Sequence, residues 1–226
     1  NSGTALDAFA GVIAGGAAGL GASISVPSIT NTTTARMTGA VSNGGRTTEV
    51  RASSSETITV TLGTAGLGLL GVAGSIGVAS INCTTNALIN AGSRNSQVNQ
   101  NPAYASSIQD VTVTATDVAG MATNVGSVAG GAVGVGVAVN VASITNQVNA
   151  TIGSNGVVSA GRDVVVKADS TWDIDAFTVA FSGGLLAAIN GSVGVVRIGG
   201  ALDGDGANEA NNMENDANSE INMSGG

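Results

Sequence analysis

The stretch Val133-Gly-Val-Gly-Val-Ala-Val-Asn-Val-Ala-Ser-Ile144 decides the fold class of this chain. Valine occupies every second position from 133 to 141, and the residues between are mostly glycine or alanine. Alternate residues of an extended chain point to opposite faces, so all five valines share one face. Because β-branched residues that alternate with glycine are typical of a strand and unfavourable in a helix, the stretch predicts β-structure.

The same pattern recurs along the chain at a spacing that predicts an internal repeat. The segment Val141-Ala-Ser-Ile144 matches Val78-Ala-Ser-Ile81 and, more loosely, Val26-Pro-Ser-Ile29. A second landmark, valine two residues before alanine, lies 29 residues before the isoleucine in two copies, at Ala52 and at Ala115. We infer a unit of about 53 residues. The segments expected at equivalent places are 19–29, 71–81 and 134–144.

Short strands that repeat in series predict an all-β fold, a β-solenoid in which each coil stacks on the last. Each unit would make either three coils of about 18 residues or two wider coils. The second copy is longer, and we expect its extra residues, Arg94 to Tyr104, to form one exposed loop. Between Trp172 and Phe181 the alternation shifts by one residue, which predicts a corner. The expected copies are 11–62, 63–125, 126–178 and a partial copy at 179–202.

The composition describes a chain of small side chains. Of 226 residues 35 are glycine, whereas only 2% are aromatic and 10% are charged. Glycine inside regular structure is unfavourable unless backbones approach closely, so we expect Gly134 and Gly136 to lie against backbone or another sheet. Cys83 is the single cysteine and excludes an intrachain disulfide. It aligns with asparagine in the other copies, and we predict a small buried residue.

The residue types present argue against enzyme activity and against nucleic-acid binding. Histidine, the commonest general base, is absent from the sequence. Asp173 and Asp175 share one face of a strand, but no second cluster accompanies them, so we interpret them as an exposed polar face. The net charge of −8 is concentrated after residue 202, and the nearly neutral remainder lacks the basic surface of a nucleic-acid-binding protein.

The acidic segment 203–226 offers the only candidate metal ligands. Asp203, Asp205 and Glu214 stand at positions one, three and twelve of a calcium-loop pattern. Ala207 and Asn208 depart from that pattern, so we favour a solvated loop, cap or tail, with calcium as the alternative. No other cofactor is expected.

A membrane helix is the alternative structure for residues 118–145, which carry no charge and exceed the ~20 residues that a span needs. The strict valine alternation and the polar residues Thr123 and Asn140 favour a strand instead. No methionine and no leader opens the chain, and we expect a fragment of a longer polypeptide.

The valine–glycine alternation, Ser143-Ile-Thr-Asn146 and Ser159-Ala-Gly-Arg-Asp-Val-Val-Val166 together resemble the repeat regions of large bacterial exoproteins. These include filamentous-haemagglutinin-like and leukotoxin-like proteins and the passengers of autotransporter adhesins. The resemblance implies a right-handed parallel β-helix, secretion to the cell surface or medium, and service as an adhesin scaffold. The alternative that it implies is the body of a membrane-active toxin.

The expected partners are host-cell or neighbouring bacterial surface molecules, together with the rest of a longer exoprotein; nucleic acid is not expected. A membrane is a possible partner that we do not favour. Within the chain, the inserted loop is the predicted contact site, because it holds the single tyrosine and a run of amides. The contact residues named there are Arg94, Asn99 and Tyr104.

Overall fold

The computed structural model describes residues 1–39, 41–43, 46–89, 96–154 and 156–199, which are almost entirely strand. The one helical element among them is the short 3-10 helix η1 (Pro102–Tyr104). The all-β prediction is confirmed, and the membrane-helix alternative is wrong because residues 118–145 lie within β6. No described helix has the length and apolar character that crossing a bilayer requires. The strands are β1 (Ser2–Ser25), β2 (Ser28–Met37), β3 (Val41–Ser42), β4 (Thr47–Ile89), β5 (Ser96–Val98), β6 (Asp110–Ile152), β7 (Gly156–Val158) and β8 (Val164–Ile198).

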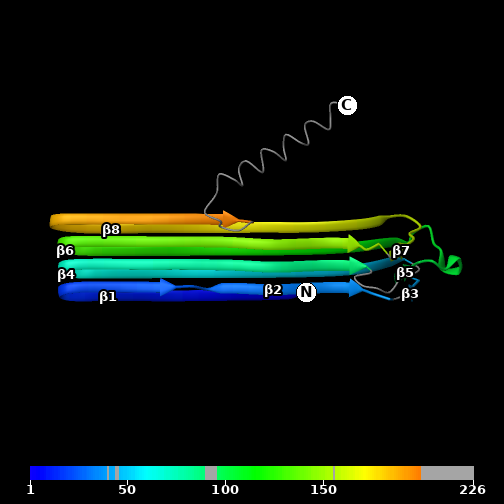
Figure 1. The fold of residues 1–226 in the computed structure, drawn as a ribbon, viewed down its shortest axis with the longest axis horizontal. Helices are drawn as coiled ribbons and strands as arrows, with labels where there is room; N and C mark the ends of the chain where they lie inside the picture. Colours follow the sequence, from blue (N-terminus) through cyan, green and yellow to red (C-terminus); the bar gives the residue numbers. More distant parts are fainter. Residues whose placement is uncertain (40, 44–45, 90–95, 155, 200–226) are drawn as a thin grey trace, which may run out of the picture.

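The long strands stack in parallel in the order β1, β4, β6 and β8, with β2 continuing the layer of β1 (Figure 1). The predicted equivalent residues pair directly: Gly71 with Gly134, and Ile81 with Ile144. Partners are 52 residues apart between β1 and β4, 63 between β4 and β6, and 53 at the start of β8. Each repeat therefore adds a single layer, and neither of the predicted subdivisions into coils occurs.

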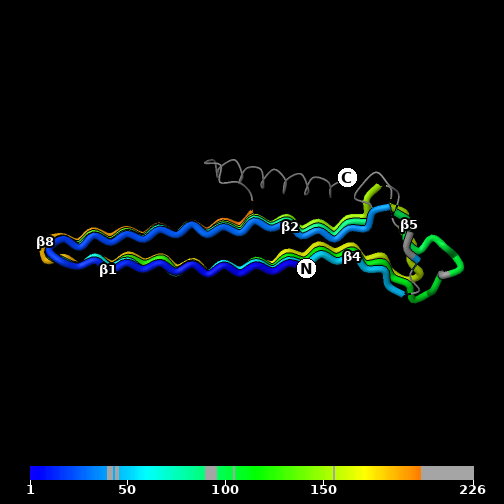
Figure 2. The backbone as a smooth tube through the Cα atoms, turned by 90° about the horizontal axis from the view of Figure 1, so that it is seen from below, coloured from blue at the N-terminus to red at the C-terminus, as the bar shows by residue number. Residues whose placement is uncertain are grey.

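Each long strand folds back on itself, so the sheet curls into two facing halves (Figure 2). Contacts within β4 show this directly, because the hydroxyls of Thr64 and Ser75 lie 2.7 Å apart and those of Ser54 and Thr85 lie 2.6 Å apart. The midpoint of both pairs falls between Leu69 and Leu70, so β4 folds back there, close to Gly68. A side chain at Gly68 would overlap the carbonyl oxygen of Gly16 in the neighbouring layer, so the layers can stack here only without one.

The interior between the two halves is built by the alternating residues that point inward. One apolar cluster includes Ile58, Val60, Ile81 and Ile144, and a second, nearer the connecting loops, includes Val113. The inner glycines behave as predicted: a Cβ at Gly136 would lie 2.7 Å from the carbonyl oxygen of Phe181. Gly134 is equally close to the backbone of β8, and Ala138 is fully buried.

Two local predictions are wrong. No corner interrupts residues 172–181, because β8 runs straight through them; Trp172 pairs with the buried Ala119 on the inner face, whereas Phe177 is exposed on the outer face. The extra residues of the second repeat do not form one exposed loop. Residues Ser96–Val98 form β5, which pairs with β3 and β7 in a small parallel sheet, and Val98 is fully buried.

Candidate functional site

The predicted contact and metal residues are only partly within the described structure. Asp203, Asp205, Glu214 and Arg94 lie outside the described residues. Asn99 follows β5 in a left-handed conformation with φ of 57°, and its buried amide donates to the Ser159 carbonyl at 3.1 Å. Tyr104 ends η1. The contact site in this loop stays a prediction.

Asp173 and Asp175 lie on the outer face of β8, where both are exposed. Their neighbours in β6 are Gly120 and Ala122, so no catalytic partner stands beside them. Within the described part of the chain, no group of three or more Cys, Asp or Glu residues could hold a metal ion. The two carboxylates give this surface negative charge, but no second functional group on β6 lies beside them.

A buried polar layer, which the sequence analysis did not find, separates the two apolar clusters. Glu56 is fully buried and accepts a hydrogen bond from the Asn31 amide at 2.6 Å. Asp117, on the neighbouring long strand β6, is also buried and accepts hydrogen bonds from Ser54 and Asn146. The bonds from Asn31 and Asn146 cross from one half of the curled sheet to the other, and the bond from Ser54 joins adjacent strands of one half, so together they tie the two halves and the stacked strands.

The surroundings of Glu56 and Cys83 raise the pKa of both groups and favour their protonated forms. Burial raises the pKa of Glu56, and the nearby Asp117 carboxylate raises it further, although the Asn31 hydrogen bond lowers it. Burial and the charge of Glu56 raise the pKa of Cys83 to about 12. Cys83 is therefore a buried thiol, as predicted, and pairs in register with Asn31 and Asn146. No described cation forms an ion pair with either carboxyl group.

A signal for this layer was present in the sequence. Glu56 lies at an even position between Ala52 and Ile58, which both point inward, and Asp117 lies at an odd position between Ala115 and Ala119. Strand alternation therefore assigns both carboxyl groups to the interior. Because charged residues usually face solvent, these two carboxyl groups were not expected in the interior.

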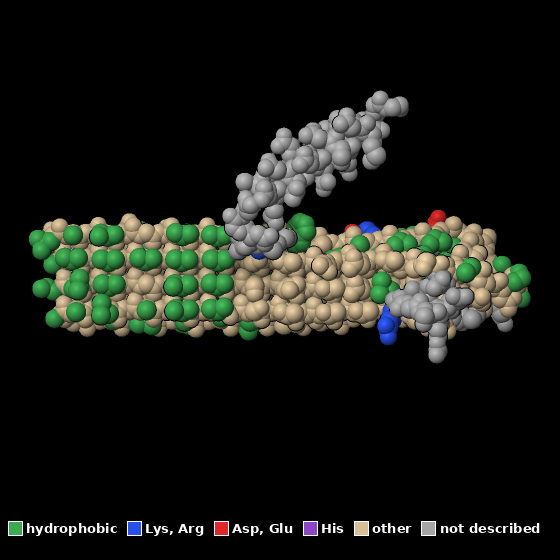
Figure 3. All heavy atoms as spheres, viewed as in Figure 1, with side chains coloured by type: hydrophobic (Ala, Val, Ile, Leu, Met, Phe, Trp, Pro, Cys, Tyr) green, Lys and Arg blue, Asp and Glu red, His purple; other side chains and the backbone are tan. Residues whose placement is uncertain are grey.

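The outer surface carries the more extensive feature, a charge-free region that we name the apolar half. It is the part of each layer on both sides of the fold-back, and no charged residue occurs in it. Figure 3 shows hydrophobic side chains in rows across all layers at this end, followed by a stretch in which hydrophobic side chains are few. The apolar half consists of residues 9–26, 61–78, 124–141 and 177–195, which are in register.

Both halves of the sheet change from apolar to polar at the same level. On the outer face of the returning half, the rows of Val78 and Ile76 give way to a serine ladder in which Ser80 donates to Ser28 at 2.9 Å. On the other half, the row of Phe9 and Phe177, which has Thr61 and Asn124 on the two middle strands, gives way to the row that contains Asp7 and Asp175. These boundaries lie at equal distances along the chain from the fold-back.

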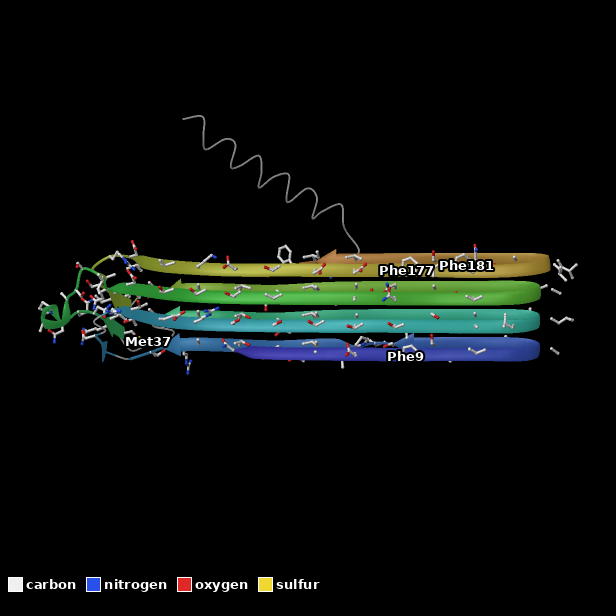
Figure 4. The ribbon with its side chains drawn as sticks, turned by 180° about the vertical axis from the view of Figure 1, so that it is seen from behind. Phe9, Met37, Phe177 and Phe181 are labelled. Atoms are coloured by element: carbon white, nitrogen blue, oxygen red, sulfur yellow. The ribbon has the colours of Figure 1, made fainter. Side chains whose placement is uncertain are left out.

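A shallow apolar groove of about 620 Å³ crosses the layers within the apolar half. Phe9 lines one side, and Ile13 and Phe181 line the other; Figure 4 shows the labelled Phe9 and Phe181 on the first and last layers. Glycines between them keep the groove open, because a Cβ at Gly63 would meet no atom within 4 Å. The groove offers hydrophobic contact and no titratable group.

No protein-family model, curated protein or solved structure matches this chain.

Proposed function

We propose that this chain is a non-enzymatic structural segment of a secreted or surface-displayed bacterial adhesin, in which it acts as an elongated scaffold. The observation that carries the proposal is the register, because equivalent residues of successive repeats lie in continuous rows across the layers. The segment would be a right-handed parallel β-helix, since parallel crossover connections are right-handed in about 98% of cases.

The physical support is that every layer uses its neighbours to bury its inner face. Ile29, Ile81 and Ile144 form one such buried row. A stack of this kind extends by adding layers without any change to its core, which suits an extended surface structure. The resemblance to bacterial exoprotein repeats supports the extracellular localisation.

The position of the titratable groups supports a structural role over a catalytic one. The carboxyl groups of Glu56 and Asp117 hydrogen-bond to side chains inside the curled sheet, where a substrate has no access. The exposed carboxylates Asp173 and Asp175 lie on a strand face without a neighbouring base.

Duplicating one repeat tests the scaffold directly. A variant with a second copy of residues 126–178 inserted after residue 178 keeps the phase of the strands, because Val125 and Thr178 are register partners. The scaffold gains one layer, so small-angle scattering should show growth of about 4.8 Å along the stack, with unchanged circular dichroism per residue. A duplicate that remains unstructured or aggregates would contradict the proposal.

Adhesion and membrane damage separate the adhesin from the alternative of a toxin body. Beads coated with the chain should adhere to cultured host cells more than albumin-coated beads do, and the soluble chain should compete. Rapid release of dye from lipid vesicles, without bead adhesion, would favour the toxin.

A further inference from the structure

Several of the most exposed large hydrophobic side chains among the described residues lie at the fold-back. Leu185 is 92% exposed, Leu186 is 82% exposed and Leu69 is 75% exposed. We name these three leucines the rim. Ile13 and Phe9, on the adjoining outer face, are also more than 80% exposed. Leu185 and Leu186 lie where β8 has one more residue than β6, at the register shift between Gly131 and Val133.

Apolar side chains and glycines cover both outer faces, apart from Thr61 and Asn124 at the border of one face, and continue around the rim. Nine residues on each side of the fold-back, across four layers, give each face about 30 Å by 14 Å, or roughly 400 Å². Patches of this size on soluble proteins mark interaction sites. All described charged residues lie outside this half.

We infer that the apolar half docks on a lipid bilayer rim first, with the rim at the boundary between the headgroups and the acyl chains. A second copy of the chain or another flat protein would cover one face and leave the other face and the rim exposed. A bilayer accommodates the rim and the adjoining rows of both faces together, without needing charge or hydrogen bonds from the protein. The two faces also lose their apolar character at the same level, about 30 Å from the fold-back, so neither face brings charge near the rim.

The edges of the stack limit how deeply this chain enters. β1 and β8 form the two edges of the large sheet and have no further strand partner among the described residues. Unpaired backbone groups in hydrocarbon are costly, so the chain by itself should insert its rim only to the boundary between headgroups and acyl chains. The polar half, with Arg36 and Lys167, stays in water.

Matched charge variants test the inference with the complete chain and vesicles of zwitterionic phosphatidylcholine. Wild-type protein should float with the vesicles, and added salt should not release it, because the contact is apolar. Leu185→Glu with Leu186→Glu should weaken binding at least about tenfold. Thr32→Glu with Thr34→Glu adds the same charge to exposed positions of the polar half and should leave binding unchanged. Circular dichroism checks that all variants fold.

A fluorescence probe gives the orientation. Trp172, the single tryptophan, lies in the polar half and should not be quenched by brominated lipid. In the Trp172→Phe background, Leu185→Trp should shift to the blue and be quenched. Failure of wild-type protein to bind vesicles, equal loss in both charge variants, or quenching of Trp172 alone would overturn the inference. So would lipid-free oligomers that dissociate in the rim variant, because a second copy would then be the occupant.

Discussion

Two glycines, one pointing inward and one pointing outward, allow a test in which the same substitution to alanine has opposite effects on stability. Gly136 points inward, and an added Cβ would lie 2.7 Å from the carbonyl oxygen of Phe181 and 3.4 Å from its carbon. Relief requires a shift of several tenths of an ångström, but β6 is paired on both edges by β4 and β8 and cannot move freely. Gly136→Ala should therefore lower the free energy of unfolding by about 1–3 kcal/mol through overpacking.

Gly74 is the matched control, because it lies in a central strand of the same half and points outward. An added Cβ there would meet no atom within 4 Å. Gly74→Ala should raise the free energy of unfolding by about 0.5–1 kcal/mol, since alanine loses less conformational freedom on folding. Urea denaturation monitored by circular dichroism would measure both, and a chain of this size should shift its melting temperature by about 2–4 °C per kcal/mol. A neutral or stabilising Gly136→Ala would refute the close packing of the two halves.

Three further predictions follow from the titratable groups. The pKa of Glu56 is raised in the folded protein, so the folded state keeps a proton that the unfolded chain releases near the ordinary pKa of 4.5. The free energy of unfolding should therefore fall as the pH rises from 4.5 through the folded pKa. Glu56→Gln should flatten this pH dependence in melting curves. Cys83, with its pKa raised to about 12, should resist alkylation at pH 8 in the folded protein and react readily in urea; reaction at equal rates would show an accessible thiol. The Nε of the exposed Arg162 donates to the partly buried Asp110 at 2.9 Å and lowers the pKa of that carboxyl, so Arg162→Ala should raise that pKa in an NMR titration and barely change stability.

The register could be predicted from the sequence because the rows are built from recurring side chains. Ile81 and Ile144 fill the same buried row, and the identical spacing from the preceding alanine fixes their pairing. The position of the fold-back could not be predicted in the same way. Gly68 has no distinctive turn residue beside it, and glycine is so frequent in this chain that no single one marks a reversal.

The exposed outer surface of the apolar half could not be predicted from the sequence for a related reason. The shift in alternation between Trp172 and Phe181 predicts a corner, but in the structure it marks the level at which apolar residues begin to occupy the outer face. Alternation identifies two faces without showing which one is buried, and here the outer face of the apolar half carries the larger apolar side chains, whereas the inner face holds small residues such as Gly136 and Ser75. The arrangement of the two facing halves of the sheet is needed to tell which rows of side chains pack against each other and which remain exposed.

The register offset also determines the order in which the molecule can assemble. Every long strand pairs with residues 52 to 63 positions away, about a quarter of the 226-residue chain, so local contacts give little help and folding should be slow. A layer can close only after a whole repeat has become available, and it then presents a complete edge to the next repeat. Growth from a finished layer involves a smaller entropic cost than formation of the first pair, which makes that first pair the nucleus. A chain released gradually from one end would thus fold layer by layer, each repeat acting as the template for its successor.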